Sequence, residues 1–161
     1  MKLKILCWNV RGANDSSKRK LIKAFVRNQK VDLLCIQEKI QLMSEGVVRS
    51  IGVGRYLDWR ALDASGSTRG ILICWDKRLL ELLEWEEGQF SISCRFRKVE
   101  DRAVWVFTGV YGPFTKNERD CLWDEIRAIR GLWEEHWCVG DDFNVILSQR
   151  ERIGKGEFLQ R

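Results

Sequence analysis

Short apolar runs and longer amphipathic stretches alternate along the first half of the chain. The runs Lys4–Val10, Val31–Gln37 and Gly70–Trp75 are apolar almost throughout, which is typical of strands buried on both faces. Between them, Ser17–Gln29 places its apolar residues on one stripe at helical spacing, and Ile40–Ile51 repeats this pattern more weakly. The order predicted for this half is therefore strand, helix, strand, helix, strand.

The second half is richer in predicted strands. Gln89–Arg97 alternates strictly between apolar and polar residues, and Arg102–Tyr111 returns as an apolar strand, so the pair predicts an antiparallel hairpin. Thr115 followed by Glu118 is a capping-box pattern that begins a helix, and Trp137–Leu147 predicts a last strand around a polar centre. Alternating strands and helices followed by a β-rich part favour an α/β layered fold, with sheets covered by helices.

Length and composition indicate one domain. The chain has 161 residues, 45% of them hydrophobic, and no Pro/Gly/Ser-rich stretch divides it. We expect residues 1–148 to form the domain and the charged, glycine-dotted residues 149–161 to fray. No apolar run approaches the roughly 18 residues that cross a bilayer, and the start reaches Asn9 too early for a signal peptide. We expect a monomeric protein that does not associate with a membrane. Its expected location is intracellular, either nuclear or cytoplasmic.

The cysteines are predicted to be reduced core residues. The chain has six, of which five lie inside strand-like runs, and no C-x-x-C motif occurs. The single histidine, His136, cannot complete a zinc-binding set. We therefore expect no disulfides.

Positive charge is concentrated near the start of the chain. The net charge is +5, and residues 1–30 carry nine basic groups against one acidic group. Such a region can steer a polyanion toward one face of the protein, although a solvated helix face would show the same pattern. Six of these groups belong to the first predicted helix and its end: Lys18, Arg19, Lys20, Lys23, Arg27 and Lys30.

Polar residues that end the apolar strands are the candidates for chemistry, because a strand end holds its side chains in place while the following loop leaves them open. Taken singly, a carboxylate at such a place is more often a cap or turn residue, and a tyrosine is more often an amphipathic core residue. The candidates are Asn9, Gln37, Glu38, Tyr111, Asp142 and Asn144.

Taken together and in order, these motifs resemble those of the endonuclease/exonuclease/phosphatase superfamily, in particular the apurinic-like endonuclease domain of LINE-type (non-LTR) retrotransposons. The resemblance lies in residues 5–12 (ILCWNVRG), 34–38 (LCIQE), 70–75 (GILICW), 109–113 (GVYGP) and 142–144 (DFN). It implies a four-layer α/β sandwich of the DNase I-like type, with two facing sheets and outer helices. It also implies hydrolysis of a DNA phosphodiester with Mg²⁺, or alternatively Mn²⁺, at one end of the sandwich.

The resemblance assigns a role to each candidate. Glu38 corresponds to the carboxylate that holds the metal, in keeping with the preference of Mg²⁺ for oxygen ligands. Asn9 corresponds to the residue that positions this carboxylate and the scissile phosphate, and Tyr111 to one whose hydroxyl contacts the phosphate. Asp142 corresponds to the acid/base group, and Asn144 to the residue that holds it in place.

Three departures from the family pattern bear on activity. Arg11 stands where many relatives have an acidic residue, as is usual for the LINE branch, and implies a contact with nucleic acid. Asp141 replaces a glycine and adds a like charge beside Asp142. The family's Ser-Asp-His segment has no counterpart within the 161 residues, and His136 precedes the last strand and cannot replace it.

The missing segment leaves the nature of the protein open. Because that segment supplies closing strands and the catalytic histidine of the family, we expect a sandwich that is incomplete at its C-terminal end and a chain without nuclease activity. A catalytically dead retrotransposon remnant that binds nucleic acid weakly is one alternative, and a phosphatase of the same superfamily is another.

Overall fold

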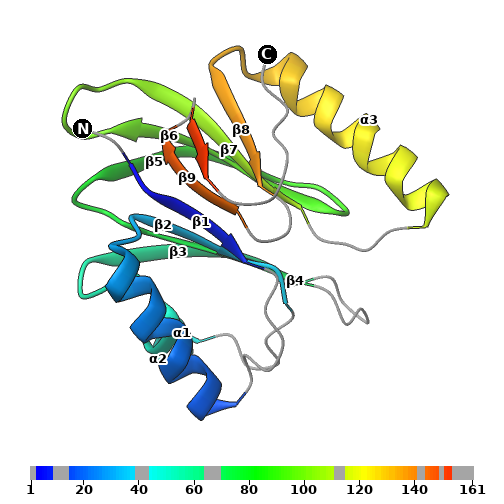
Figure 1. Cartoon of the computed structure of the whole chain (residues 1–161). Helices are drawn as coiled ribbons and strands as arrows, with labels where there is room; N and C mark the ends of the chain where they lie inside the picture. The colour runs from blue at the N-terminus through cyan, green and yellow to red at the C-terminus, as the bar shows by residue number, and fades with distance from the viewer. Residues whose placement is uncertain are drawn as a thin grey trace.

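The computed structural model describes residues 3–8, 15–38, 44–63, 70–110, 115–140, 144–148 and 151–153 (Figure 1). The helices are α1 (Ser16–Gln29), α2 (Glu45–Ile51) and α3 (Lys116–Leu132). The strands are β1 (Ile5–Trp8), β2 (Leu33–Ile36), β3 (Leu57–Asp63), β4 (Gly70–Asp76), β5 (Leu80–Glu87), β6 (Ser91–Lys98), β7 (Val104–Val110), β8 (His136–Gly140), β9 (Asn144–Ser148) and β10 (Glu151–Ile153).

The described strands form two sheets. The first has the order β10-β9-β1-β2-β4-β3, in which β1 and β2 are parallel and the other neighbours are antiparallel. The second has the order β5-β6-β7-β8, in which β7 and β8 are parallel. Each sheet therefore contains one parallel pair, and a helix lies between its two strands along the chain: α1 between β1 and β2, and α3 between β7 and β8.

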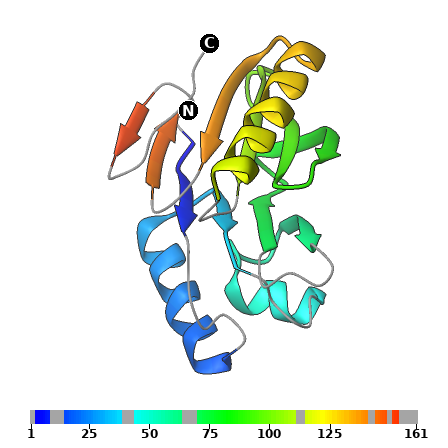
Figure 2. The same ribbon diagram turned by 90° about the vertical axis from the view of Figure 1, so that its right-hand side faces the viewer.

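The two sheets face each other, with α1 and α2 on the outer side of the first sheet and α3 on the outer side of the second (Figures 1 and 2). The expected four-layer α/β sandwich is thus confirmed. No helix within the described parts of the chain is both long and apolar enough to span a bilayer.

The strands of the first sheet are apolar on both faces because both faces are covered. Their residues alternate between two clusters: Ile5, Cys7, Leu33 and Cys35 pack toward the second sheet, and their neighbours, such as Leu34, pack toward α1 and α2. This period of two explains why the sequence of these strands is a continuous apolar run.

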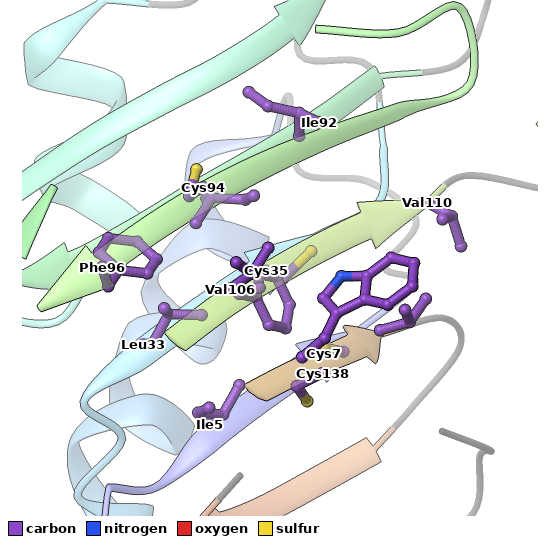
Figure 3. Packing of buried hydrophobic residues seen from close by; sticks show 14 of the residues in the cluster. Ile5, Cys7, Leu33, Cys35, Ile92, Cys94, Phe96, Val106, Val110 and Cys138 are labelled. Atoms are coloured by element: carbon purple, nitrogen blue, oxygen red, sulfur yellow. The ribbon is translucent and has the colours of Figure 1, made fainter. Parts of the chain in front are cut away.

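Cysteines contribute much of the layer between the sheets. Cys7, Cys35, Cys94 and Cys138 all lie in this interior (Figure 3), and each is 0% exposed. Cys74 is equally buried on the helical side of the first sheet, whereas Cys121 is exposed on α3; all six are free thiols. Burial raises the pKa of the Cys74 thiol to about 12 and also raises the pKa values of Cys94 and Cys138. The prediction of five core cysteines is confirmed.

Helix α3 is held to the second sheet by polar contacts as well as by Leu122 and Ile126. Its capping box is formed as predicted: the Thr115 Oγ1 accepts from the Glu118 amide at 3.2 Å, and the Glu118 carboxylate accepts from the Thr115 amide at 3.0 Å. In the middle of the helix, both carboxylate oxygens of Glu125 accept from the amide of Phe90, at 3.1 and 3.0 Å.

The structure corrects one predicted strand. The segment Trp137–Leu147 is not a single strand but two, because β8 ends at Gly140 in one sheet and β9 begins at Asn144 in the other. The intervening residues include Asp141 and Asp142, and two adjacent carboxylates do not suit a continuous buried strand.

Two strands and one helix boundary also differ from the pattern-based expectation. β3 and β5 were not predicted; β5 lies at a sheet edge, carries many glutamates, and is stabilised by pairs such as Glu81–Arg97 (2.6 Å) that join distant parts of the sequence. Helix α2 starts at Glu45 rather than Ile40, because Ser44 caps it; residues 40–43 lie outside the described residues. Glu151–Ile153, within the expected tail, pairs with β9.

Candidate functional site

The ends of four strands and the start of a fifth meet at one edge of the sandwich. The parallel strands β1 and β2 end at Trp8 and Ile36, and the parallel strands β7 and β8 end at Val110 and Gly140. Since parallel strands end at the same side of their sheet, each pair delivers the following residues of the chain to a common edge. β9, which is antiparallel to β1, starts at this edge, with Asn144 opposite Cys7.

Gln37 joins the edges of the two sheets. It follows β2 directly, is 6% exposed, and its Nε2 donates to the main-chain oxygens of Val110 and of Gly140, the latter at 3.3 Å. The main-chain amide of Gln37 donates to the main-chain oxygen of Trp8 at 3.0 Å. One side-chain amide has two protons, so this residue satisfies both carbonyls while it ties the ends of β7 and β8 to the ends of β1 and β2.

The sheets approach each other closely at this edge because glycines face cysteines. Gly109 and Gly140 are register partners in β7 and β8, and Cys7 and Cys35 are register partners in β1 and β2. A Cβ atom at Gly109 would lie 2.9 Å from the Cys35 sulfur, and one at Gly140 would overlap the Cys7 sulfur. Residues without side chains are therefore required at the last position of β8 and next to the last position of β7, directly before the candidate residues.

The structure places two of the six assigned site residues. Glu38 is half-buried and follows Gln37 at the end of β2, as predicted. The backbone of Asn144 begins β9 at the same edge. The other four, Asn9, Arg11, Tyr111 and Asp142, lie outside the described residues; Asn9 and Tyr111 directly follow Trp8 and Val110, the last residues of β1 and β7.

The donor chemistry at this edge suits a hard cation. Glu38 offers carboxylate oxygens at a partly accessible position, whereas the thiols of Cys7 and Cys35 are 0% exposed and lie between the sheets. Oxygen ligands of this kind hold Mg²⁺ or Mn²⁺ rather than soft metals. Within the described residues no three Asp, Glu, His or Cys side chains form a metal-binding group.

His136 lies far from this edge. It is the first residue of β8 and is exposed, and it lies four positions before Gly140, which corresponds to roughly 13 Å at 3.3 Å per residue. The expectation that His136 does not belong to the site agrees with this position.

The sequence pattern identifies Gln37 as a strand-terminal residue but indicates no role for it. Its connecting role depends on Val110 and Gly140, which are 73 and 103 residues away in the sequence. The available signal was an amide side chain placed between a fully apolar strand and a carboxylate, since such a buried polar group requires partners.

Comparison with known proteins places this architecture in a class. Solved structures that share the fold include an endonuclease/exonuclease/phosphatase family protein from Bacteroides thetaiotaomicron, with a TM-score of 0.69 and 12% identity over 86% of this chain and 62% of that one. A mannosyl-6-phosphatase from the same organism has a TM-score of 0.66 and 10% identity over 85% of this chain and 63% of that one. The fold is that of endonuclease/exonuclease/phosphatase proteins.

A particular relative is found among curated proteins. The chain is 26% identical over 156 residues to the probable RNA-directed DNA polymerase from transposon BS of Drosophila melanogaster; the match covers 88% of this chain and 16% of that protein. The chain thus spans about a sixth of the length of this relative. No family model matches the sequence.

Proposed function

We propose that this chain belongs to the endonuclease/exonuclease/phosphatase family and serves as a DNA-nicking domain of a LINE-type retrotransposon. The observation that carries the proposal is the pair of hydrogen bonds from Gln37 to the ends of β7 and β8, because they bring the ends of strands from both sheets to one edge. Every assigned catalytic residue follows or begins one of these strands in the sequence. The similarity to a transposon polymerase supports DNA as the substrate.

In the proposed reaction each residue has one task. Glu38 would hold Mg²⁺, and the bound ion would supply positive charge at the scissile phosphate. Asn9 and Tyr111 donate hydrogen bonds to phosphate oxygens and orient the phosphate for in-line attack by water. Asp142 accepts or donates the proton that this hydrolysis moves, and Asn144 keeps the Asp142 carboxylate oriented. Arg11 contacts the DNA backbone.

Nicking of supercoiled plasmid by this chain fused to a relative's Ser-Asp-His segment tests the proposal, because we expect no nicking by the 161 residues alone. Mg²⁺ should be required, and Glu38→Gln should lower the rate by at least about 100-fold, because a lost metal ligand costs no less than the 10–100-fold typical of outer-shell partners. Glu134→Gln is the matched control, since Glu134 is exposed and lies at the other end of β8. Nicking that survives both EDTA and Glu38→Gln would contradict the proposal.

A parallel assay separates the alternatives. The mannosyl-6-phosphatase with the same fold makes a phosphomonoesterase the second candidate. Release of inorganic phosphate from a sugar phosphate, lost in Glu38→Gln and without plasmid nicking, would identify that activity instead. Salt-sensitive DNA binding without either activity would identify a remnant that only binds nucleic acid.

A further inference from the structure

A basic cleft lies on the outer face of the first sheet, between the C-terminal ends of α1 and α2. It has a volume of about 170 Å³, compared with about 30 Å³ for one water molecule in the liquid, so it has room for a phosphate group. Its lining residues come from two short segments of the chain: Lys23, Val26, Arg27, Lys30 and Val31, followed by Gly52, Val53 and Gly54.

The cations of the cleft belong to one stripe of α1. Lys20, Lys23, Arg27 and Lys30 follow one another at intervals of three and four residues, and residues 16–30 contain no carboxylate. Like charges at this spacing destabilise a helix. The stripe extends about 15 Å along the helix, which matches roughly four phosphates of one strand at 3.4 Å each.

The cleft is built rather than a chance gap. The Lys23 Nζ donates to the main-chain oxygen of Arg49 at 2.9 Å, which ties α1 to α2 and leaves two protons for a ligand. The Arg49 guanidinium in turn donates to the main-chain oxygen of Arg55 at 3.0 Å, next to Gly54, which lines the cleft. The acidic group on α2 is Glu45, an exposed side chain 3.9 Å from Arg49.

Helix stabilisation alone does not explain these charges. A cation in the last turn of a helix interacts favourably with its dipole, and this accounts for Arg27 in α1 and Arg49 in α2. It does not account for Lys23, in the middle of α1. Lys30, the C-cap of α1, has φ 54° and ψ 51°, a conformation in which glycine is the favoured residue after a helix.

We propose that this cleft is a second phosphate-binding site, which takes the backbone of nucleic acid at a distance from the strand-end site. Val31, which lines the cleft, lies two positions before β2, and Gln37 directly follows β2, so the two sites are separated by at least the length of this strand, roughly 13 Å for four residues. The choice of nucleic acid as the ligand rests on the proposed function; the preference for phosphate follows from the cations.

The test uses two double variants that remove the same charge. Arg27→Gln/Lys30→Gly changes two exposed residues of the cleft, and the glycine suits the left-handed backbone, so folding is preserved and the Tm should be unchanged or higher. Lys116→Gln/Arg119→Gln changes two exposed residues of α3, over the other sheet. Both variants lower the net charge from +5 to +3.

Binding of a short fluorescein-labelled DNA duplex is then measured by anisotropy across a salt series. The cleft variant should bind more weakly, and the slope of log K against log salt should fall by about two, one for each phosphate that the variant can no longer neutralise. The α3 variant should retain the wild-type slope. Equal weakening in both variants, or wild-type binding by the cleft variant, would overturn the proposal.

Further measurements identify the ligand and test this proposal independently of the proposed function. If the cleft variant loses binding to phosphatidylserine vesicles but not to the duplex, the ligand is a lipid and the proposal fails. Glu38→Gln should retain the cleft-dependent binding. Cleft-dependent binding without nicking would overturn the proposed function alone, whereas Glu38-dependent nicking with unaltered binding by the cleft variant would overturn this proposal alone.

Discussion

The sulfur of Cys7 occupies the space that a side chain at Gly140 would need. This contact joins the end of β8 to the end of β1, and the ring of Phe107 lies 3.0 Å from the same position on another side. The contact lies beside the Gln37 hydrogen bond to the Gly140 oxygen, so close packing and hydrogen bonding act on one residue.

Gly140→Ala should therefore destabilise the domain. An added methyl group would meet Cys7 and Phe107 in an interior without free space, and overpacking typically costs about 1–3 kcal/mol. Gly131→Ala is the matched control, because Gly131 lies in α3 with no atom within 4 Å of the new Cβ, and should stabilise by about 0.5–1 kcal/mol. Urea unfolding of both variants measures the difference.

Adding Cys7→Ala to Gly140→Ala should recover part of the lost stability, because it removes the overlapping sulfur. If the double variant is no more stable than Gly140→Ala alone, the clash with Cys7 is not the cause.

Gln37→Glu should make stability depend strongly on pH. At neutral pH a carboxylate would face the oxygens of Val110 and Gly140 without a proton to donate, and an uncompensated buried charge costs about 3–5 kcal/mol. Repulsion and burial would raise the folded-state pKa of the new carboxyl above its unfolded value of about 4.3. The part of the destabilisation that is due to the charge is thus absent below the unfolded pKa and grows as pH rises through the folded one, while the lost second proton lowers stability at every pH.

Thermal melting between mildly acidic and neutral pH measures this effect. Asn28→Asp, the same change of an amide to a carboxyl group at an exposed position, serves as the control and should follow the wild type. A Gln37→Glu variant that melts like wild type at neutral pH would show that the amide protons are not needed.

Much of the fold could be predicted because its signals are local. The period-two alternation of β6, the capping box at Thr115 and the apolar runs of β1 and β2 each lie within a few residues and need no distant partner. The strand-terminal position of Glu38 followed from the same pattern. β5 could not be found in this way, because its glutamates pair with Arg95 and Arg97 of β6 only after the sheet has formed.

The need for distant partners also limits what could be predicted about the site. Gln37 was visible as a polar residue, but its partners come from the other sheet, and nothing near it in the sequence identifies them. The break between β8 and β9 was missed because apolar runs, 137–139 and 145–147, lie on both sides of the polar centre, so the two strands looked like one.

Asp32→Asn should stabilise the protein at neutral pH. Burial raises the pKa of Asp32 above its ordinary 3.8, although the Lys4 amide, which donates to its carboxylate at 2.9 Å, lowers it in part, and the charge of Asp76 adds to the rise. The native state therefore holds the proton more tightly than the unfolded state, and stability falls as pH rises from about 3.8 through the folded pKa. Asparagine keeps the acceptor and removes the charge.

Urea unfolding over this pH range should show the advantage of Asp32→Asn growing with pH. Asp120→Asn, on the exposed side of α3, is the control. If Asp32→Asn is less stable than wild type at neutral pH, the charge on Asp32 stabilises the folded state.

Native protein should react with a thiol reagent at one cysteine. Cys121 is exposed, whereas the other five are buried, and burial raises the pKa values of Cys74, Cys94 and Cys138, which keeps them as unreactive thiols. Mass spectrometry after brief alkylation should locate the label on Cys121, and Cys121→Ser should abolish fast labelling. Rapid modification of all six before unfolding would contradict the buried arrangement.

Helix α3 cannot leave its sheet without taking part of that sheet with it. The Glu125 carboxylate accepts the Phe90 amide with both oxygens and the Ser91 hydroxyl at 3.3 Å, so opening the helix would strip the turn between β5 and β6 of its acceptor. The amides of this turn and of the middle of α3 belong to one cooperative unit of local unfolding. A single carboxylate, which is part of neither the turn nor the strand-end site, thus couples the opening of α3 to the opening of this turn, in addition to the packing of Leu122 and Ile126.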